Sequence, residues 1–288
     1  MHSFFNRHTF TPLFLLLFSF VLTSCLDSSD SGRTVGNLLE EAENYTDFET
    51  FLEHLSTTEL DSTIANEEDR FTVLVPVNEA FSGVPDSANI DSLILSYHII
   101  NEEVDLNTLE AGAEERFQSL QGEDVFFVIG EDSLYINGSN YLGGVRAING
   151  VIYATNRVLF PDSHLNVSGL ISKRYQLNVL DDAIDEAGLS SVLEDPASAY
   201  TVFAPSDEAL GDTDLSAEDV QYHIIEQKLL SSDLGSQTYT TLNGQELTVD
   251  VNGTITVNGD ATVTTEDIEG TNGVIHIIDA PLTGSGEE

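Results

Sequence analysis

The stretch FTVLVPVNEAF, residues 71–81, decides the fold because it returns as YTVFAPSDEAL at residues 200–210. Each copy begins with five residues rich in β-branched and aromatic side chains and then has a proline, which predicts a strand that stops there. Each copy continues with Asn or Asp followed by Glu-Ala, which predicts a short helix running to the end of the stretch. Asn78 and Asp207 are the candidate N-caps of these two helices.

Three further blocks recur downstream in the same order. They are YHII at residues 97–100 and 222–225, LQG at 120–122 and LNG at 242–244, and NGVIY at 149–153 and NGVIH at 272–276. The offset between copies drifts by only a few residues from block to block, which chance does not produce. The chain therefore contains two homologous domains, each of a size at which a single hydrophobic core is viable.

The residues around these blocks predict a mixed fold. Apolar residues at helical spacing predict helices over residues 48–55 and 177–184, and a second helix in each copy carries the Tyr-His pair. In the second copy, SAED at residues 216–219 resembles a capping box. Strands are expected over residues 126–129, 133–136 and 151–153, and over 247–251, 254–257 and 274–278. Because helices and strands are segregated along each copy, the predicted fold class is α+β.

Three Asn-Gly pairs are predicted to lie in turns. Asn252-Gly253 stands between two alternating runs and predicts a two-residue hairpin. At residues 149–150 and 272–273 the glycine would supply a positive φ at little cost, and asparagine tolerates a positive φ as well.

Together the blocks resemble the fasciclin-like (FAS1) domain. The resemblance rests on the Thr-Val strand with its proline and Glu-Ala helix, on Tyr-His followed by two aliphatic residues, and on Asn-Gly-Val-Ile before a last strand. All three occur in order in both copies, over residues 34–162 and 166–282. The resemblance implies two tandem FAS1 β-wedge domains with flanking helices. It also implies adhesion or extracellular-matrix attachment, as in tandem modules of secreted or membrane-anchored proteins.

The same resemblance makes Tyr97, His98, Tyr222 and His223 candidate partner-contact residues, since this region takes part in integrin recognition in animal relatives. The alternative is that each histidine packs at the end of its helix and hydrogen-bonds to the backbone, where it would hold the fold together.

The amino-acid composition indicates a globular, strongly acidic protein. The chain has 288 residues, 50 Asp+Glu against 9 Lys+Arg and a net charge of -41, yet 41% of its residues are hydrophobic, as in a globular protein. A surface this acidic repels a phosphate backbone, so nucleic acid is not an expected partner. The acid is spread along the whole chain, which indicates either adaptation to high salt (halophilic adaptation) or simply an acidic secreted protein.

The N-terminus predicts a lipoprotein. Residues 1–24 combine a mildly basic start with an apolar run too short to span a bilayer, as in a signal peptide. LTSC at residues 22–25 resembles the bacterial lipobox, which implies cleavage before Cys25 and lipidation of its sulfur. The alternative is a buried free thiol after an ordinary signal peptide. Leu26 after the cysteine implies, by resemblance to sorting rules, the outer membrane, so the predicted location is a lipid anchor in the cell envelope.

The remaining segments complete the domain organisation. Residues 25–33 are small and polar and predict a flexible tether. Residues 163–168 predict a short linker whose last residues overlap the start of the second domain at 166. Motion between the two domains is the default expectation for such a linker. Residues 283–288 predict a disordered tail.

No sequence signature of an enzyme is present. The chain has no Gly-x-Ser-x-Gly, Walker, Gly-x-Gly-x-x-Gly or His-Glu-x-x-His motif, and we expect no catalytic residues, no metal site and no cofactor. Its single cysteine excludes an internal disulfide framework and a cysteine-based zinc cluster. A pair of acids for glycoside cleavage stays open, because nothing in the sequence selects one.

The sequence therefore favours a non-enzymatic envelope lipoprotein. Its expected partners are the membrane, through the lipid, and a protein or polysaccharide on a cell surface or in a matrix. The alternative is an envelope protein that binds a small ligand or a polysaccharide, which would need an enclosed apolar pocket with converging polar groups. A purely structural spacer also stays open. The sequence does not identify the partner, the membrane face or the oligomeric state.

Overall fold

A computed structural model describes residues 34–84, 89–130 and 133–283. The described residues from Val35 onward belong to one compact unit. The predicted signal peptide, Cys25, the tether at 25–33 and residues 284–288 of the predicted tail lie outside the described residues. We refer to residues 34–162 as repeat 1 and to residues 163–283 as repeat 2.

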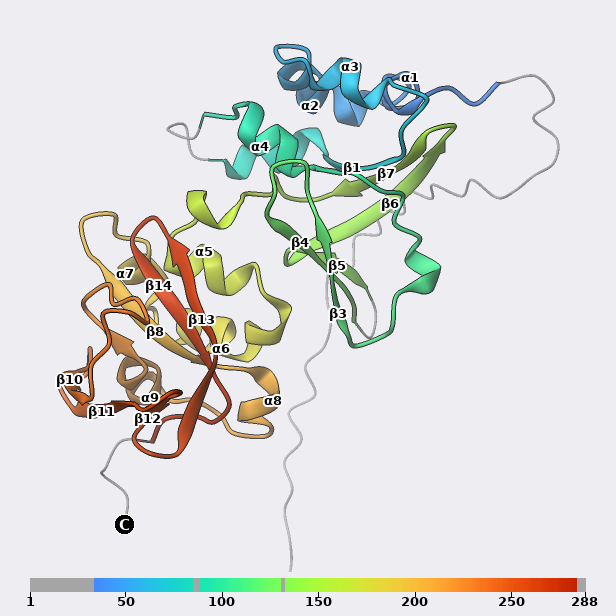
Figure 1. The fold of residues 1–288 in the computed structure, drawn as a ribbon. Coiled ribbons are helices and arrows are strands. Elements are labelled where there is room, and N and C mark those ends of the chain that lie inside the picture. The colour runs from blue at the N-terminus through green and yellow to red at the C-terminus, as the bar shows by residue number, and fades with distance from the viewer. Residues whose placement is uncertain (1–33, 85–88, 131–132, 284–288) are drawn as a thin grey trace, which may run out of the picture. The chain divides into compact units, whose positions relative to one another are not determined.

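Repeat 1 combines a seven-stranded sheet with short helices (Figure 1). The strand order is β2-β1-β7-β6-β5-β4-β3, in which β1 and β7 are parallel and the other neighbours are antiparallel. Its elements are α1 (Leu38–Ala42), η1 (Thr46–Phe48), α2 (Glu49–Leu55), α3 (Leu60–Ile64), β1 (Phe71–Pro76), η2 (Asn78–Gly83), α4 (Ser92–Tyr97), β2 (Ile99–Ile100), η3 (Leu106–Thr108), β3 (Glu114–Gln118), β4 (Asp124–Ile129), β5 (Leu134–Ile136), β6 (Ser139–Ala147) and β7 (Gly150–Thr155).

Repeat 2 has the same topology. Its sheet runs β9-β8-β14-β13-β12-β11-β10, which is the order of the corresponding strands of repeat 1, and β8 and β14 form its parallel pair. The short η4 (Asp162–His164) spans the boundary between the repeats. The elements of repeat 2 are α5 (Val167–Ser172), η5 (Tyr175–Leu177), α6 (Asn178–Glu186), α7 (Ser190–Leu193), β8 (Tyr200–Pro205), α8 (Asp207–Leu210), α9 (Ala217–Tyr222), β9 (Ile224–Ile225), β10 (Gln237–Thr240), β11 (Glu246–Val251), β12 (Ile255–Val257), β13 (Ala261–Gly270) and β14 (Gly273–Ile278).

Each repeat buries its own core. The apolar clusters of repeat 1, around Phe51 and Phe127, and those of repeat 2, around Leu180 and Leu247, share no residue among the part of the chain that is described. Strands β1 and β8 are buried at every position, and each lies inside its sheet between two neighbours. A strand covered on both faces has an apolar run rather than an alternating pattern, which explains the two quoted stretches.

The structure corrects the two predicted N-caps by one residue. Asp207 is the first residue of α8, and Ser206 before it is the N-cap, whose Oγ accepts a hydrogen bond from the Ala209 N–H at 3.1 Å. Asn78 likewise starts η2, and Val77 before it is still extended. The N-cap lies one residue earlier than predicted because that position requires extended backbone, which the residue directly after the proline adopts. The predicted capping box of Ser216 with Asp219 is confirmed.

The hairpin at Asn252-Gly253 has a three-residue loop, so the two-residue prediction is wrong. Val251 pairs with Ile255, and of the predicted pair only Gly253 has a positive φ, of 88°. A two-residue turn of the type that Asn-Gly favours needs a positive φ at both of its central positions. Asn137-Gly138 meets that requirement, with φ values of 50° and 68° between strands β5 and β6.

Candidate functional site

In each repeat the Tyr-His pair lies at the C-terminal end of the helix that precedes the second strand. Asp91 caps α4 by accepting from two backbone N–H groups, and Ser216 caps α9 through its capping box. Both helices stop at the tyrosine, and the histidine after it is the C-cap. Neighbouring position in the sequence therefore places a phenol and an imidazole at the same helix end.

Each histidine ties its helix to the segment after the last strand. His98 Nδ1 lies 2.8 Å from the Ile94 carbonyl, and its Nε2 accepts a hydrogen bond from the Leu159 N–H at 3.0 Å. His223 repeats both contacts, with Nδ1 at 2.7 Å from the Asp219 carbonyl and the Leu282 N–H at 2.9 Å from Nε2. Burial lowers the pKa of both imidazoles to about 4, so they are neutral at pH 7.

Each tyrosine ties the same helix to the sheet. The Tyr97 hydroxyl donates to the Asp124 carbonyl at 2.7 Å and accepts from Asn137 Nδ2 at 2.8 Å. The Tyr222 hydroxyl makes the matching bonds to the Glu246 carbonyl and Asn258 Nδ2, at 3.0 and 2.9 Å. Burial raises the pKa of Tyr97 above its usual value, so the phenol stays protonated. The asparagines that complete this network were not selected by sequence analysis.

All four candidate contact residues are inside their repeats. Tyr97, His98, Tyr222 and His223 are at most 2% exposed, and each has its polar atoms hydrogen-bonded to its own repeat. The geometry thus gives them a role in holding the fold, and direct contact with a partner stays a proposal for all four.

A buried asparagine at the start of the last block has a role that sequence analysis missed. Asn149 Oδ1 accepts from the Leu38 N–H at 2.8 Å, and its Nδ2 donates to the carbonyls of Ile64 and Asn66. It therefore joins the N-terminus of α1 and the end of α3 to the turn before β7. Asn272 makes the equivalent three bonds in repeat 2. The signal was the recurrence of Asn-Gly-Val-Ile in both copies.

The neighbouring glycines are needed for close approach rather than for a positive φ alone. A Cβ at Gly150 would lie 1.9 Å from the Phe71 carbonyl oxygen, and one at Gly273 would lie 2.3 Å from that of Tyr200. Gly150 has a φ of 147°, whereas Gly273 is not among the residues with positive φ. The turn expectation holds for Asn149 and Asn272, but Gly150 and Gly273 are the first residues of β7 and β14, and the expected positive φ is absent at Gly273.

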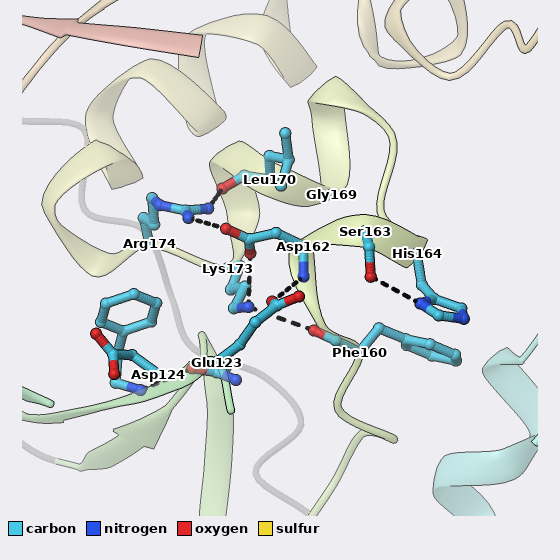
Figure 2. A network of polar contacts seen from close by, with 12 residues as sticks. Glu123, Asp124, Phe160, Asp162, Ser163, His164, Gly169, Leu170, Lys173 and Arg174 are labelled. Atoms are coloured by element: carbon cyan, nitrogen blue, oxygen red, sulfur yellow. Dashed lines mark hydrogen bonds and ion pairs between the residues drawn. The ribbon is translucent and has the colours of Figure 1, made fainter. Parts of the chain in front are cut away.

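The described residues also form a charged junction where repeat 1 meets repeat 2 (Figure 2). Lys173 and Arg174 follow directly after α5, and both reach the Asp162 carboxylate. Lys173 Nζ lies 2.6 Å from Asp162 Oδ1, and Arg174 Nη2 binds Oδ2. Arg174 also donates to the Leu170 carbonyl at 2.8 Å. The Asp162 N–H in turn donates to Glu123 Oε2 at 2.7 Å, which links the group to the sheet of repeat 1.

Aromatic rings of repeat 1 form the floor of this junction. Lys173 Nζ lies 4.8 Å from the centre of the Tyr97 ring and 5.7 Å from that of Phe126, and the Arg174 guanidinium carbon lies 5.5 Å from the Phe126 ring. These distances are within the range of cation–π attraction. Gly138 permits the approach, because a Cβ there would lie 2.2 Å from the Ser172 carbonyl oxygen. Tyr97 therefore contacts the second repeat through its ring.

The junction charges are largely removed from water. The side chains of Lys173 and Arg174 are only 4% and 5% exposed, and that of Asp162 is 24% exposed. Burial opposes ionisation of Asp162, but Arg174 and Lys173 together lower the pKa of its carboxyl below the usual value. Burial lowers the pKa of Lys173, and Asp162 counteracts part of that shift. A shared carboxylate between two buried cations makes the group stable only as a set.

The segment 163–168, predicted as a linker, is partly helical. It contains the end of η4 and the beginning of α5, with Asn166 as the N-cap that accepts from the Gly169 N–H. Because Asp162 stands at one end of this short segment and Lys173 soon after the other, the junction closes a compact loop.

The described residues give little support for a metal site, a membrane-spanning helix or acid catalysis. They contain no group of three or more His, Cys, Asp or Glu able to hold a metal ion, and no helix with the length and apolar character needed to cross a bilayer. Burial, together with Asp185 and Asp182, raises the pKa of Asp181 to about 6. Asp181 is not among the residues that line the two cavities described below.

Repeat 1 carries an open cavity of about 680 Å³. Its lining is mostly apolar, and Glu79 and Arg157 lie at it as charged groups. A smaller cavity of about 170 Å³ shares Arg157 and reaches Lys173 at the junction. The larger cavity has the volume of a small-molecule site, although it is open rather than enclosed.

Comparison with known proteins agrees with this architecture. The Fasciclin domain model matches the chain twice, over residues 46–161 and 175–284. Periostin from Homo sapiens is 30% identical over 225 residues, which cover 72% of this chain and 26% of periostin. Transforming growth factor-beta-induced protein ig-h3 from Oryctolagus cuniculus is 27% identical over 244 residues, which cover 74% of this chain and 34% of that protein. The chain thus spans about a quarter to a third of the length of these relatives.

The fold has a counterpart among solved structures. The FAS1 domain pair from the insect cell adhesion molecule Fasciclin I superposes with a TM-score of 0.52 at 21% sequence identity, over 84% of this chain and 98% of that one. The predicted fold class, tandem domains of mixed α and β structure, is confirmed. The chain belongs to the fasciclin (FAS1) domain family.

Proposed function

We propose that the protein is a non-catalytic adhesion module held at a bacterial cell envelope by a lipid. The signal peptide would be removed before Cys25, residues 25–33 would act as a tether, and the two FAS1 domains, at 34–162 and 166–282, would bind a protein or polysaccharide on a surface or in a matrix. The short tail at 283–288 has no assigned role.

The observation that carries this proposal is the pairing of two fasciclin repeats in one compact unit, with their contact built from buried charges. An ordered pair presents two surfaces at a fixed spacing, so a partner that fits both is bound without the cost of ordering a linker. Many such chains anchored in one plane would raise the effective concentration and turn weak contacts into lasting attachment. The relatives add the family context, since one of them is named a cell adhesion molecule.

The acidic coat limits which partners are suitable. With a net charge of -41, the surface repels anionic polymers at low salt and favours neutral or cationic partners. Screening by salt weakens this preference, because at about 1 M salt the Debye length is roughly 3 Å. Binding that is insensitive to salt would therefore point to apolar or hydrogen-bonded contacts.

The first test separates anchoring from binding. Cys25→Ala should move the protein from the membrane fraction to the soluble fraction and abolish incorporation of labelled palmitate, with Ser24→Ala at the neighbouring position as the matched control. Retention of the Cys25→Ala protein in the membrane fraction would contradict lipid anchoring.

The second test measures attachment. Deletion of the gene should reduce cell attachment or biofilm, and expression of the intact chain should restore it. Protease treatment of intact cells would show at the same time whether the domains face outward. Unchanged attachment, biofilm and aggregation in the deletion strain would count against adhesion.

A second candidate function rests on the cavity of about 680 Å³ in repeat 1. An apolar lining with Arg157 and Glu79 beside it would suit a small amphipathic ligand or one end of a polysaccharide. Leu142, which lines the cavity and is 47% exposed, offers the substitution Leu142→Asp as a test. Native mass spectrometry of the purified protein should show a bound ligand that this variant loses; a ligand-free protein would remove the candidate.

A further inference from the structure

The contact between the repeats joins two kinds of surface, and each repeat has a structural equivalent of both. One is the end face next to the Tyr-His network, which repeat 1 contributes. The other is the helix end after α5, which repeat 2 contributes. The chain also contains the second example of each surface, the end face of repeat 2 and the helix end after α1, and these two do not take part in the junction.

Hydrogen bonds establish which residues correspond on the two end faces. The Phe126 N–H donates to Asn137 Oδ1, and the Thr248 N–H donates to Asn258 Oδ1 in the same way. Both asparagines also bind the tyrosine of their repeat. Thr248 therefore occupies the position of Phe126, and Gln245, the residue before β11, occupies that of Glu123, the residue before β4.

The two helix ends correspond through their N-caps. Asn37 caps α1 and Asn166 caps α5, and the next residue of each helix donates its N–H to the buried asparagine of the last block. Counting on from these caps, Asn44 stands where Lys173 stands and Tyr45 stands where Arg174 stands.

The free surfaces lack the chemistry that joins the repeats. Phe126 is 8% exposed under the two cations, whereas Thr248 is exposed and offers no ring. Gln245 has no charge, and neither Asn44 nor Tyr45 is a cation. Residues 1–160 hold 26 acidic and 6 basic side chains and the rest hold 24 and 3, so any unspecific contact between repeats is opposed by like charge.

We propose that the junction is exclusive: Lys173 and Arg174, with Phe126, Glu123 and Asp162, determine that repeat 2 docks on repeat 1 and that copies of the chain do not add head to tail. The pair is then a single ordered unit that stays monomeric. Its two outer ends stay available for a partner of a different kind. This inference concerns docking alone and holds whether or not the protein is an adhesin.

Transplanting the junction residues tests the proposal directly, in the compact chain from Val35 to Glu288. One half-graft carries Asn44→Lys and Tyr45→Arg. The other carries Gln245→Glu and Thr248→Phe, at the counterparts of Glu123 and Phe126. Each half-graft alone should be monomeric by analytical ultracentrifugation, and an equimolar mixture should form a 1:1 dimer.

The full graft on one chain should form longer head-to-tail chains, since a contact between unlike surfaces does not close on itself. The unmodified protein should stay monomeric at the same concentrations. A mixture of folded half-grafts that stays monomeric would overturn the proposal, and so would head-to-tail association of the unmodified protein.

A second measurement applies if a graft does not fold. The double variant Lys173→Gln, Arg174→Gln should let the repeats separate, seen as a larger radius of gyration and a broader distance distribution between spin labels on the two repeats. Lys228→Gln is the matched control, because Lys228 pairs with Glu269 at a partly exposed site within repeat 2. Unchanged distances in the double variant would overturn the proposal.

Discussion

The Tyr-His networks of repeat 1 and repeat 2 have the same hydrogen bonds, but different residues surround them. Tyr97 and Tyr222 each bind a strand carbonyl and an asparagine, with distances that agree within about 0.3 Å. Between these two tyrosines, the described contacts place a lysine over the ring of Tyr97 alone. The comparison separates what holds a fasciclin repeat together, which is common to both copies, from what joins one repeat to the next, which a few residues on one face decide.

The largest effect should come from the glycines that both repeats share. Gly150→Ala would place a Cβ 1.9 Å from the Phe71 carbonyl oxygen, and Gly273→Ala would place one 2.3 Å from that of Tyr200. Because the contacts are to backbone that cannot move aside cheaply, each variant should lose more than about 4 kcal/mol. Amide NMR spectra should show repeat 1 unfolded in the first variant and repeat 2 unfolded in the second.

Gly188→Ala is a control for the positive φ alone, since a Cβ at Gly188 meets nothing within 4 Å although its φ is 68°. Simultaneous loss of both repeats in either test variant would contradict separate cores.

The next effect should be confined to the junction. Asp162→Asn leaves two buried cations without a carboxylate, which costs about 3–5 kcal/mol where the charges cannot reach water. If the junction opens, the cations reach water, so the loss of stability cannot exceed the cost of opening it. We therefore expect the free energy of unfolding, measured by urea denaturation, to fall by about 3 kcal/mol. We also expect the protein to unfold in two steps instead of one. Glu269→Gln removes the partner of the partly exposed Lys228 and should cost less than about 0.5 kcal/mol. Equal losses in the two variants would show that the junction does not matter for stability.

Acid should affect both repeats through their histidines. The folded-state pKa of His98 and of His223 is about 4, below the ordinary value of 6.5, so the unfolded chain takes up protons that the folded chain does not. Stability should therefore be complete above pH 6.5 and fall as the pH is lowered towards 4, by up to about 3 kcal/mol for each histidine.

His98→Gln and His223→Gln should each flatten this pH dependence by the same amount, measured as the free energy of unfolding at pH 7 and pH 4.5. Asp181, with its pKa raised to about 6, contributes with the opposite sign in both variants and cancels in the comparison. A flattening in one variant only would mean that the two histidines are not equivalent.

The smallest effect should be the same in both repeats. Tyr97→Phe and Tyr222→Phe each leave an asparagine donor and a strand carbonyl without a partner, which should cost about 1–2 kcal/mol. In the Tyr97→Phe variant an aromatic ring would still lie under Lys173, so the junction should persist in small-angle scattering. A clearly larger loss in the Tyr97→Phe variant would show that the hydroxyl itself supports the contact between the repeats.

Much of the fold could be predicted from the repeated sequence pattern. The apolar runs at 71–75 and 200–204 predicted strands β1 and β8, and the helical spacing from Phe48 and from Leu177 predicted α2 and α6, because each pattern has the period of its element. The exact starts of η2 and α8 and the loop at Asn252-Gly253 were wrong, because a single residue of extended backbone decides them.

By itself the sequence determined that two similar domains exist, several of the strands and helices that each contains, and that the Tyr-His and Asn-Gly blocks lie at equivalent places. It did not predict α1, α3, β2, β3 and β6 or their counterparts in repeat 2. Only the tertiary structure showed that Asn149 and Asn272 bind helix ends far away in the sequence, and that Lys173 and Arg174 meet Asp162 over Tyr97 and Phe126. The physical reason is how far apart in the sequence the interacting residues lie. Secondary structure follows from the periodicity of a few neighbouring residues. A buried ion group instead depends on side chains that folding brings together and removes from water.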